Sequence, residues 1–134
     1  MPADKKNGDG LLRQDFPGGW EGDSRDFFAG ENVNDIEKEA FDLTRRLLKW
    51  RKGNPLVAEG KLLQIPLVEG VYIYQRVLPS GGRVTIMLNG TNEEKRLTLS
   101  DLPLSMPLSV RDFFTGKTFS GEAVIPARDV LLLE

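Results

Sequence analysis

The chain has 134 residues, no cysteine and no histidine, and a formal net charge of -2 from 18 basic and 20 acidic side chains. This composition excludes disulfides, thiol nucleophiles, imidazole-based catalytic triads and zinc sites built from cysteine and histidine. It offers no basic field for nucleic acid and no polybasic segment for a membrane, and no apolar run approaches the roughly 20 residues of a spanning helix. We therefore expect neither nucleic acid nor membrane as a partner, and any chemistry must use carboxylates, hydroxyls, lysines or arginines.

The first 33 residues are polar and rich in glycine, and they contain the stretch "GDGLLRQDFPGGW" at 8–20. Glycine and proline at this density rule out a helix or a strand, so the segment is predicted to be one long loop. Loops longer than about 15 residues are uncommon inside a compact domain. Such a segment is functional, disordered, or displaced from a larger body that it once crossed.

One amphipathic helix is predicted at about residues 35–52. Asn34 is a good N-cap, and Glu37 lies where it completes a capping box. Gly53 is expected to take a left-handed cap and Pro55 to prevent continuation. The apolar face recurs at helical spacing through Ile36, Ala40, Leu43, Leu47 and Trp50, widened by Phe41, Thr44 and Leu48.

From Lys61 onward the hydrophobic period changes to two. Short segments rich in β-formers alternate with turn clusters such as "PSGG" and "NGTNEE", which predicts about eight strands in an antiparallel sandwich or barrel. In "VYIYQRVL" three apolar residues, Val71, Ile73 and Val77, alternate with Tyr72, Tyr74 and Arg76. The fold class is therefore mainly β, preceded by a long loop and one α-helix that has nothing obvious to pack against.

Several segments together resemble the C-terminal end of an α-amylase-superfamily glycoside hydrolase, of the neopullulanase and cyclomaltodextrinase branch. They are "GDGLLRQDFPGGW", "EAFDLTRRLLKWRKGNPLVAEGKL", "GVYIYQR", "VTIMLNGTNEEKRLTL" and the terminal "IPARDVLLLE". The resemblance covers essentially the whole chain. It implies that residues 1–54 are the remnant of a (β/α)8 catalytic barrel, with its last loop at 1–33 and its last helix, and that residues 55–134 are the Greek-key β-sandwich called domain C.

The resemblance also implies the function of a larger parent enzyme. Such enzymes hydrolyse α-1,4 linkages in starch, maltooligosaccharides, cyclodextrins or pullulan with retention, without an organic cofactor, in bacterial starch utilisation. The three catalytic carboxylates of the family follow barrel strands that would precede Met1, so this chain alone is expected to be inactive. The implied partners are an α-glucan oligosaccharide in the parent, the missing barrel domain, and a second copy in a homodimer. The relatives include periplasmic and cytoplasmic enzymes.

Substrate-binding residues are carried over to the opening loop. The resemblance implies that Asp9 and Arg13 hydrogen-bond sugar hydroxyls in the parent, and an ion pair that braces the loop is the alternative. Trp20 and Phe16 either stack on a sugar or pin the loop to the barrel, and we favour pinning, with a tight turn at 17–19 between them. No catalytic residue and no metal ligand is assigned. The loop acids Asp15, Asp23 and Asp26 do not have the spacing of an EF-hand and are expected to be solvated.

Three hypotheses remain open for the chain by itself. It is a catalytically silent piece of an α-glucan hydrolase, an autonomous carbohydrate-binding sandwich, or an assembly module that dimerises. The row Tyr72, Tyr74 and Arg76 is the candidate for a second sugar site, although packing against the barrel is favoured. On the first hypothesis part of the helix face, Ile36, Phe41, Leu47 and Trp50, should be uncovered in this chain and should invite association.

Overall fold

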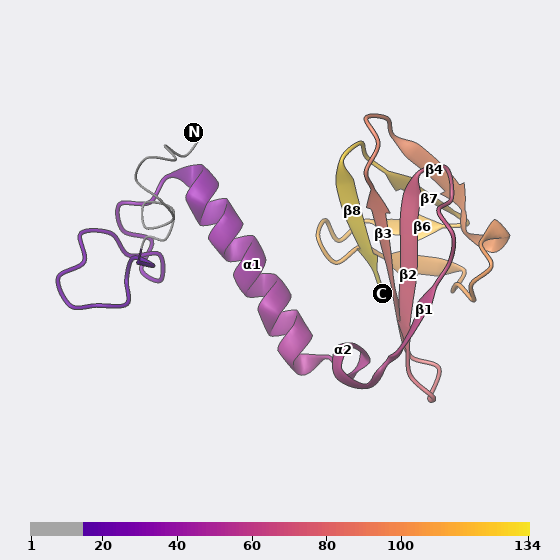
Figure 1. The fold of residues 1–134 in the computed structure, drawn as a ribbon, viewed down its shortest axis with the longest axis horizontal. Helices are drawn as coiled ribbons and strands as arrows, with labels where there is room; N and C mark the ends of the chain where they lie inside the picture. The colour runs from indigo at the N-terminus through magenta and orange to yellow at the C-terminus, as the bar shows by residue number, and fades with distance from the viewer. Residues whose placement is uncertain (1–14) are drawn as a thin grey trace, which may run out of the picture. The chain divides into compact units, whose positions relative to one another are not determined.

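The computed structural model describes residues 15–134, which include two α-helices and eight strands (Figure 1). The chain divides between Trp50 and Arg51 into two compact units. The helices are α1 (Asp35–Gly53) and α2 (Pro55–Glu59), and a 3-10 turn covers Leu99–Asp101. The strands are β1 (Lys61–Gln64), β2 (Val71–Val77), β3 (Arg83–Asn89), β4 (Lys95–Thr98), β5 (Ser109–Arg111), β6 (Thr118–Ser120), β7 (Glu122–Ile125) and β8 (Asp129–Leu133).

The first unit is a loop followed by most of α1, which begins at the predicted residue. The capping box is confirmed: the backbone N–H of Glu37 donates to Asn34 Oδ1 at 2.9 Å, and the backbone N–H of Asn34 donates to Glu37 Oε2 at 3.0 Å. Two of the helix's otherwise unpaired N–H groups are thereby satisfied. Of the four face residues named for possible exposure, Ile36 is 80% exposed, whereas Phe41, Leu47 and Trp50 are half-buried.

The predicted left-handed cap at Gly53 is wrong. Gly53 is the last residue of α1 and is absent from the residues with positive φ. The chain instead turns at Asn54, whose extended backbone (φ -111°) places its Oδ1 to accept a hydrogen bond from Leu56 N–H at 3.0 Å. Pro55 then occupies the first turn of α2, where its missing N–H costs nothing. The same proline that ends α1 therefore starts a second, short helix.

Gly60 joins α2 to β1 at a place where only glycine fits. Its N–H donates to Leu56 O at 3.1 Å, and a Cβ built on Gly60 would lie 2.3 Å from that same oxygen and 3.1 Å from Arg76 Cβ. The Gly60 carbonyl accepts a hydrogen bond from Arg76 Nη1 at 2.9 Å. This close approach of backbone and side chain holds the end of α2 near the C-terminal end of β2.

The second unit is the predicted antiparallel β-sandwich, and all eight predicted strands are confirmed. One sheet has the order β1-β2-β3-β8, and the strands β4-β7 and β5-β6 form two further pairs. Every pairing is antiparallel, with Ile73 opposite Met87 in β2-β3 and Met87 opposite Leu131 in β3-β8. These three residues are buried on one face of the four-stranded sheet.

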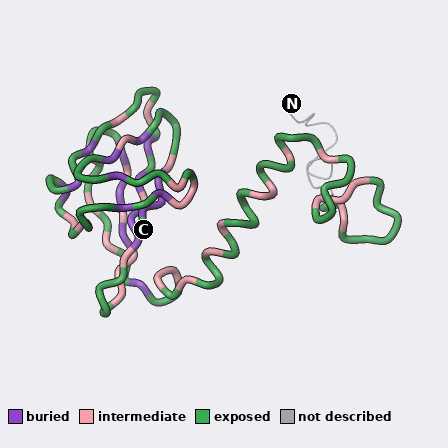
Figure 2. The backbone as a smooth tube through the Cα atoms, turned by 180° about the vertical axis from the view of Figure 1, so that it is seen from behind, coloured by how far each residue is buried: buried purple, intermediate pink, exposed green. Residues whose placement is uncertain are grey.

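The hydrophobic core fills the space between this face and the two strand pairs (Figure 2). The four-stranded sheet contributes Val71, Ile73, Met87, Leu131 and Leu133, and the strand pairs contribute Leu97, Val110, Phe119, Ala123 and Ile125. Gln75 continues the buried row of β2 at 1% exposure, whereas the predicted core residue Val77 is only half-buried. The Gln75 amide donates to Thr85 Oγ1 at 2.9 Å and to the Ser105 carbonyl at 3.1 Å, which satisfies this buried polar group.

Candidate functional site

The described part of the opening loop is anchored to α1 by an aromatic cluster. Phe16 packs against Phe27, Phe28 and Phe41 with ring centroids 5.0, 5.8 and 5.9 Å apart. Phe41 lies on α1, and its ring centroid is also within 6 Å of both Phe27 and Phe28. Such tilted and edge-on pairs stabilise beyond the area that they bury. Phe16 therefore holds the loop to α1, whereas the pinning of the loop to a barrel stays a prediction.

Two acidic residues of the loop shape its backbone. Asp23 Oδ2 accepts hydrogen bonds from Gly18 N–H (2.8 Å) and Trp20 N–H (3.3 Å), and Asp26 Oδ1 accepts from the N–H groups of residues 28 and 29. Gly18 adopts φ +99°, and a Cβ there would lie 2.4 Å from Asp26 Oδ1. The predicted tight turn at 17–19 is present, and it depends on this glycine. Among residues 15–134, no cluster of three potential metal ligands occurs.

Of the three sugar-contact residues assigned from sequence, Trp20 is the one that lies within the described residues. Asp9 and Arg13 lie outside the described residues, so their role stays a prediction. Trp20 is 75% exposed. Within the described loop its ring is not part of the phenylalanine cluster, so stacking on a sugar and pinning against a larger body both remain predictions for it.

Among the described residues, Glu37 is the carboxylate whose pKa departs from its ordinary value. The Arg25 side chain forms an ion pair and hydrogen bond with Glu37 Oε2, and the Asn34 N–H donates to the same oxygen. Hydrogen bonding by Arg25, then by the Asn34 backbone, lowers the pKa of Glu37 below its ordinary value, and partial desolvation opposes this. A general acid of a glycosidase needs a raised pKa instead, so Glu37 serves the helix start and not acid catalysis.

This contact predicts a pH dependence at the start of α1. Because the folded pKa is the lower one, the stabilisation is present above the unfolded pKa of about 4.3 and is lost as the pH falls through the folded value. We expect Arg25→Gln to raise the Glu37 pKa, measured from the carboxyl carbon shift by NMR titration. Arg45→Gln, which removes an arginine paired with Asp42, is the control and should leave the Glu37 curve unchanged. A Glu37 pKa that stays equally low without Arg25 would contradict the assignment.

Tyr72, Tyr74 and Arg76 share the outer face of β2, as predicted. The two tyrosine rings lie 5.5 Å apart with 38° between their planes, and both residues are half-buried. Arg76 is engaged by the Gly60 carbonyl. A sugar platform needs exposed and nearly coplanar rings, and this row is neither.

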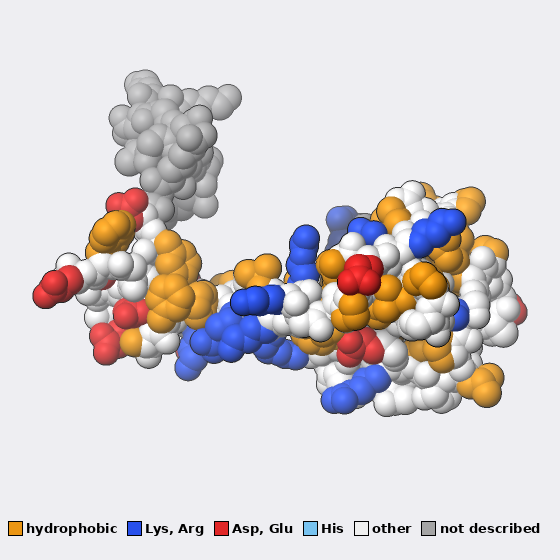
Figure 3. Space-filling model, turned by 90° about the horizontal axis from the view of Figure 1, so that it is seen from below, with side chains coloured by type: hydrophobic (Ala, Val, Ile, Leu, Met, Phe, Trp, Pro, Cys, Tyr) orange, Lys and Arg blue, Asp and Glu red, His pale blue; other side chains and the backbone are white. Residues whose placement is uncertain are grey.

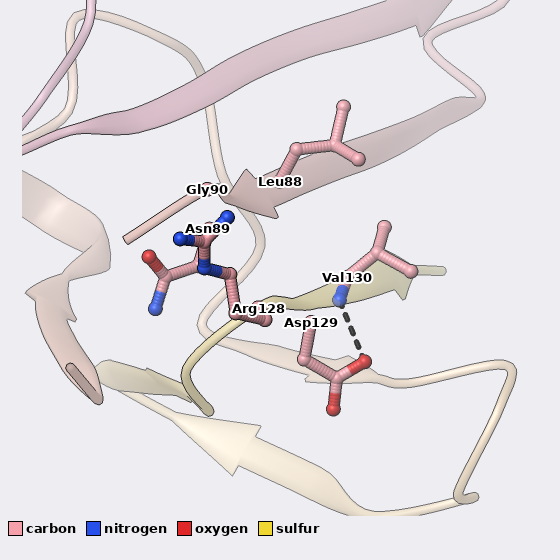
Figure 4. A pocket seen from close by; sticks show the side chains of 6 residues that line it. All are labelled: Leu88, Asn89, Gly90, Arg128, Asp129 and Val130. Carbon is pink, nitrogen blue, oxygen red and sulfur yellow. Dashed lines mark hydrogen bonds between the residues drawn. The ribbon is translucent and has the colours of Figure 1, made fainter. Parts of the chain in front are cut away.

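A shallow hollow of about 320 Å³ lies beside this row, at the end of β3 and the start of β8 (Figure 4). Leu88 and Val130 are opposite each other in the β3-β8 register, and their side chains point to the same side. Asp129 is turned away from them and accepts a hydrogen bond from Val130 N–H at 2.8 Å. Arg128 donates through Nε to Asn92 Oδ1 at 2.8 Å. The lining is mainly apolar and holds a single carboxylate.

A second hollow of about 270 Å³ is lined by the loop after β4. Its walls are Leu99, Ser100, Leu104, Ser105, Met106, Pro107, Leu108 and Gly121, none of which is ionisable. Retaining glycoside hydrolysis requires two carboxyl groups about 5 Å apart, one to attack and one to protonate the leaving oxygen. Neither hollow provides this pair. No helix in the described part of the chain is long and apolar enough to cross a membrane.

The geometry thus defines an antiparallel β-sandwich, preceded by a loop and by a helix with no buried residue. Residues 66–134 match the family described as the cyclo-malto-dextrinase C-terminal domain, and the chain belongs to that family. The chain corresponds to the C-terminal part of an α-amylase-superfamily glycoside hydrolase.

Solved structures of glycosidases share the fold. AmyP in complex with maltose is 20% identical, with a TM-score of 0.64 over 78% of this chain and 22% of that chain. An Anoxybacillus α-amylase is 20% identical, with a TM-score of 0.60 over 87% of this chain and 26% of that chain. The pullulanase from Anoxybacillus sp. LM18-11 complexed with maltotriose is 16% identical, with a TM-score of 0.55 over 78% of this chain and 16% of that chain. The chain therefore spans about a quarter or less of each enzyme's length.

Two buried polar residues that organise the sandwich were not singled out from the sequence. Asn89 begins the predicted turn cluster "NGTNEE", but it is 2% exposed and its amide donates to the carbonyls of Glu93 and Pro126. Asp112 is 0% exposed and joins the β5-β6 turn to β8. The turn sequences "NGT" and "DFFTG" could have indicated both residues. In each, an Asn or Asp side chain that can accept hydrogen bonds from backbone N–H groups precedes a glycine or a threonine.

Proposed function

We propose that this chain is the non-catalytic terminal part of a retaining glycoside hydrolase that acts on α-1,4-linked glucans such as starch, maltooligosaccharides, cyclodextrins and pullulan. The observation that carries the proposal is the family membership of residues 66–134 together with an amphipathic helix, α1, that has no buried residue. A sandwich that completes a larger enzyme would leave such a helix uncovered when it is alone. The role of the sandwich is then to support the catalytic domain.

Four carboxylates of the described residues agree with a silent role. Asp23 and Asp26 hold turns, Glu37 caps α1, and Asp112 is buried against backbone N–H groups. Each of these groups is engaged as an acceptor by the fold itself. A nucleophile and an acid facing one sugar would need to point together into a cleft. In the proposed parent they come from the catalytic barrel.

The proposed substrate class, α-1,4-linked glucans, is supported by structurally similar proteins and by the residues of the opening loop. AmyP and the Anoxybacillus pullulanase were solved with maltose and maltotriose, which are α-1,4-linked glucose oligomers. On this proposal residues 1–54 complete the barrel, Asp9 and Arg13 reach sugar hydroxyls there, and Trp20 is covered or stacked in the same place. The barrel domain is the chain's partner, and no organic cofactor takes part.

The proposal is tested by titrating the purified 134-residue chain with maltoheptaose and β-cyclodextrin, followed by calorimetry and NMR shifts, beside an overnight hydrolysis assay. We expect neither binding at millimolar sugar nor release of reducing ends. Hydrolysis would overturn the silent role. Binding would overturn the purely supporting role and favour a carbohydrate-binding sandwich, and loss of that binding in Tyr72→Ala but not in Trp20→Ala would place the site on the sheet.

A further inference from the structure

The turn after β3 begins with a dipeptide that has covalent chemistry of its own. Asn89 is the last residue of β3, and Gly90 follows it. In an Asn-Gly sequence the backbone nitrogen of the glycine can attack the side-chain amide carbon of the asparagine, because glycine has no side chain to hinder the approach. This ring closure is the first step of deamidation.

The fold holds the Asn89 side chain where this attack is blocked. Nδ2 donates to the carbonyls of Glu93, Ile125 and Pro126, and Oδ1 accepts from the N–H and the hydroxyl of Thr91. Uncharged side chains and backbone, drawn in white, cover much of the visible sandwich surface in Figure 3, whereas Asn89 is 2% exposed. To react, the side chain must turn toward the next nitrogen and release ammonia. All five hydrogen bonds oppose that change.

The backbone of Asn89 is held as well. Asn89 pairs with Val71 of β2 on one side and with Asp129 of β8 on the other. Figure 4 shows Asn89 and Gly90 at the end of β3. Closing the ring requires rotation about the Cα–C bond of Asn89, away from the extended geometry of an antiparallel strand. Pairing on both sides of β3 resists this rotation.

We propose that Asn89 is a deamidation site, which the folded sandwich protects and which unfolding opens to reaction. In the unfolded chain the Gly90 nitrogen loses its proton and bonds to Asn89 Cγ, and Nδ2 leaves as ammonia, which gives a succinimide. Water then opens the ring at one carbonyl to give aspartate or at the other to give isoaspartate. The net reaction consumes water, releases ammonia and needs no other reactant.

The conversion works in one direction only. Aspartate has no amide protons to donate to the three carbonyls that Asn89 Nδ2 serves. Isoaspartate lengthens the backbone at a residue that is paired with two strands. Both products therefore favour the unfolded state. Each period of unfolding removes a fraction of the molecules from the folded population.

Mass spectrometry of one tryptic peptide tests the site. The full chain is incubated in mildly alkaline buffer with or without guanidinium chloride, and peptide 84–95 is then sequenced by fragmentation. This peptide also contains Asn92, which precedes a glutamate and is the internal reference. We expect Asn89 to convert at least about a hundredfold faster in denaturant, because the folded chain reacts only during rare openings. Equal rates in both buffers overturn the protection, and an unconverted Asn89 in denaturant overturns the site.

Gly90→Ala is a matched variant that leaves the fold intact. A Cβ on Gly90 would meet nothing within 4 Å, and Gly90 does not have a positive φ. The melting temperature should therefore be unchanged. In denaturant, however, the added methyl group should slow the conversion of Asn89 at least about tenfold. Conversion as fast as in the wild type overturns attack by the residue 90 nitrogen.

Asp112→Ala tests whether unfolding is what opens the site. Asp112 contacts Thr115 and Leu132 and lies outside the turn of Asn89. Without denaturant, conversion of Asn89 should rise by the same factor as the unfolded fraction, measured by urea unfolding. A rate equal to that of the wild type would place the reaction in the folded sandwich and overturn the proposal. None of these experiments uses sugar, so their outcome is independent of the proposed glucan role.

Discussion

Asn89→Ala should lower the free energy of unfolding by about 3 kcal/mol, one of the two largest effects that we expect from a single substitution. The Asn89 Nδ2 group donates to the carbonyls of Glu93 (2.8 Å), Pro126 (2.9 Å) and Ile125 (3.2 Å). Its Oδ1 accepts from the N–H (3.0 Å) and hydroxyl (2.7 Å) of Thr91. Truncation leaves the Ile125 carbonyl without this donor at a buried contact, and it removes the partner of the other four groups at part-buried contacts.

In a unit of this size, about 3 kcal/mol corresponds to a melting temperature lower by about 12 to 24 °C. Circular dichroism during thermal and urea unfolding measures both quantities. Asn92→Ala, three residues along the same turn, is the matched control. Asn92 is exposed and makes one hydrogen bond, to Arg128, so its loss should cost under about 1 kcal/mol.

Asn89→Asp separates hydrogen bonding from packing. The aspartate has the same size, but at neutral pH it directs an oxygen without a proton at the carbonyls that Nδ2 now serves. We expect it to destabilise at least as much as Asn89→Ala at pH 7. If Asn89→Asp were as stable as the wild type, the hydrogen-bond network would not be what holds this turn.

The sequence predicted the order of secondary structure well because its signals are local. Turn clusters and period-two alternation located all eight strands, and the Asn34–Glu37 capping box located the start of α1. The short helix α2 was missed, although Asn54, Pro55 and Gly60 mark its two ends. Five residues are too few for a periodic pattern, and Asn54 turns the chain where Gly53 had been expected to do so.

The buried polar groups could not be assigned from alternation. Gln75 has a buried position in β2, yet a polar side chain there is ordinarily expected to face solvent. Its burial depends on Thr85, ten residues away, and on the Ser105 carbonyl, thirty residues away. Such partners are supplied by the tertiary fold. The same limit applies to the candidate sugar residues, whose chemistry would require a catalytic domain to complete it.

Family likeness and local geometry make separate contributions to the functional conclusion. The match over residues 66–134 establishes the family, and structural likeness below 25% identity establishes only the fold. The geometry adds the hydrogen-bond partners of individual carboxylates. Asp23, Asp26 and Glu37 accept hydrogen bonds from backbone N–H groups. The service of these three acids in turns and a helix cap agrees with support of a catalytic domain.

Asp112→Ala is the second substitution for which we expect a large effect. It should lower the free energy of unfolding by about 3 kcal/mol. Asp112 is 0% exposed. Its Oδ1 accepts from Leu132 N–H on β8 at 3.1 Å, and its Oδ2 accepts from the N–H (2.9 Å) and hydroxyl (2.7 Å) of Thr115. One carboxylate therefore links the β5-β6 turn to β8, the last strand in the order of the four-stranded sheet. Removing it leaves the buried Leu132 N–H without this acceptor, and it also removes the acceptor of the Thr115 N–H at a part-buried contact.

Asp112→Asn tests whether two acceptor oxygens are needed at this position or only a side chain of the same shape. An amide can present only one oxygen, so its NH2 group must face either Leu132 N–H or the Thr115 donors, and we expect an intermediate loss of about 1 to 3 kcal/mol. Asp129→Ala, at an exposed aspartate that begins β8, is the matched control and should cost under about 1 kcal/mol. Hydrogen exchange should report the site directly, because the Leu132 amide loses its acceptor in Asp112→Ala. Unchanged protection of that amide in a folded Asp112→Ala variant would contradict the role assigned to Asp112.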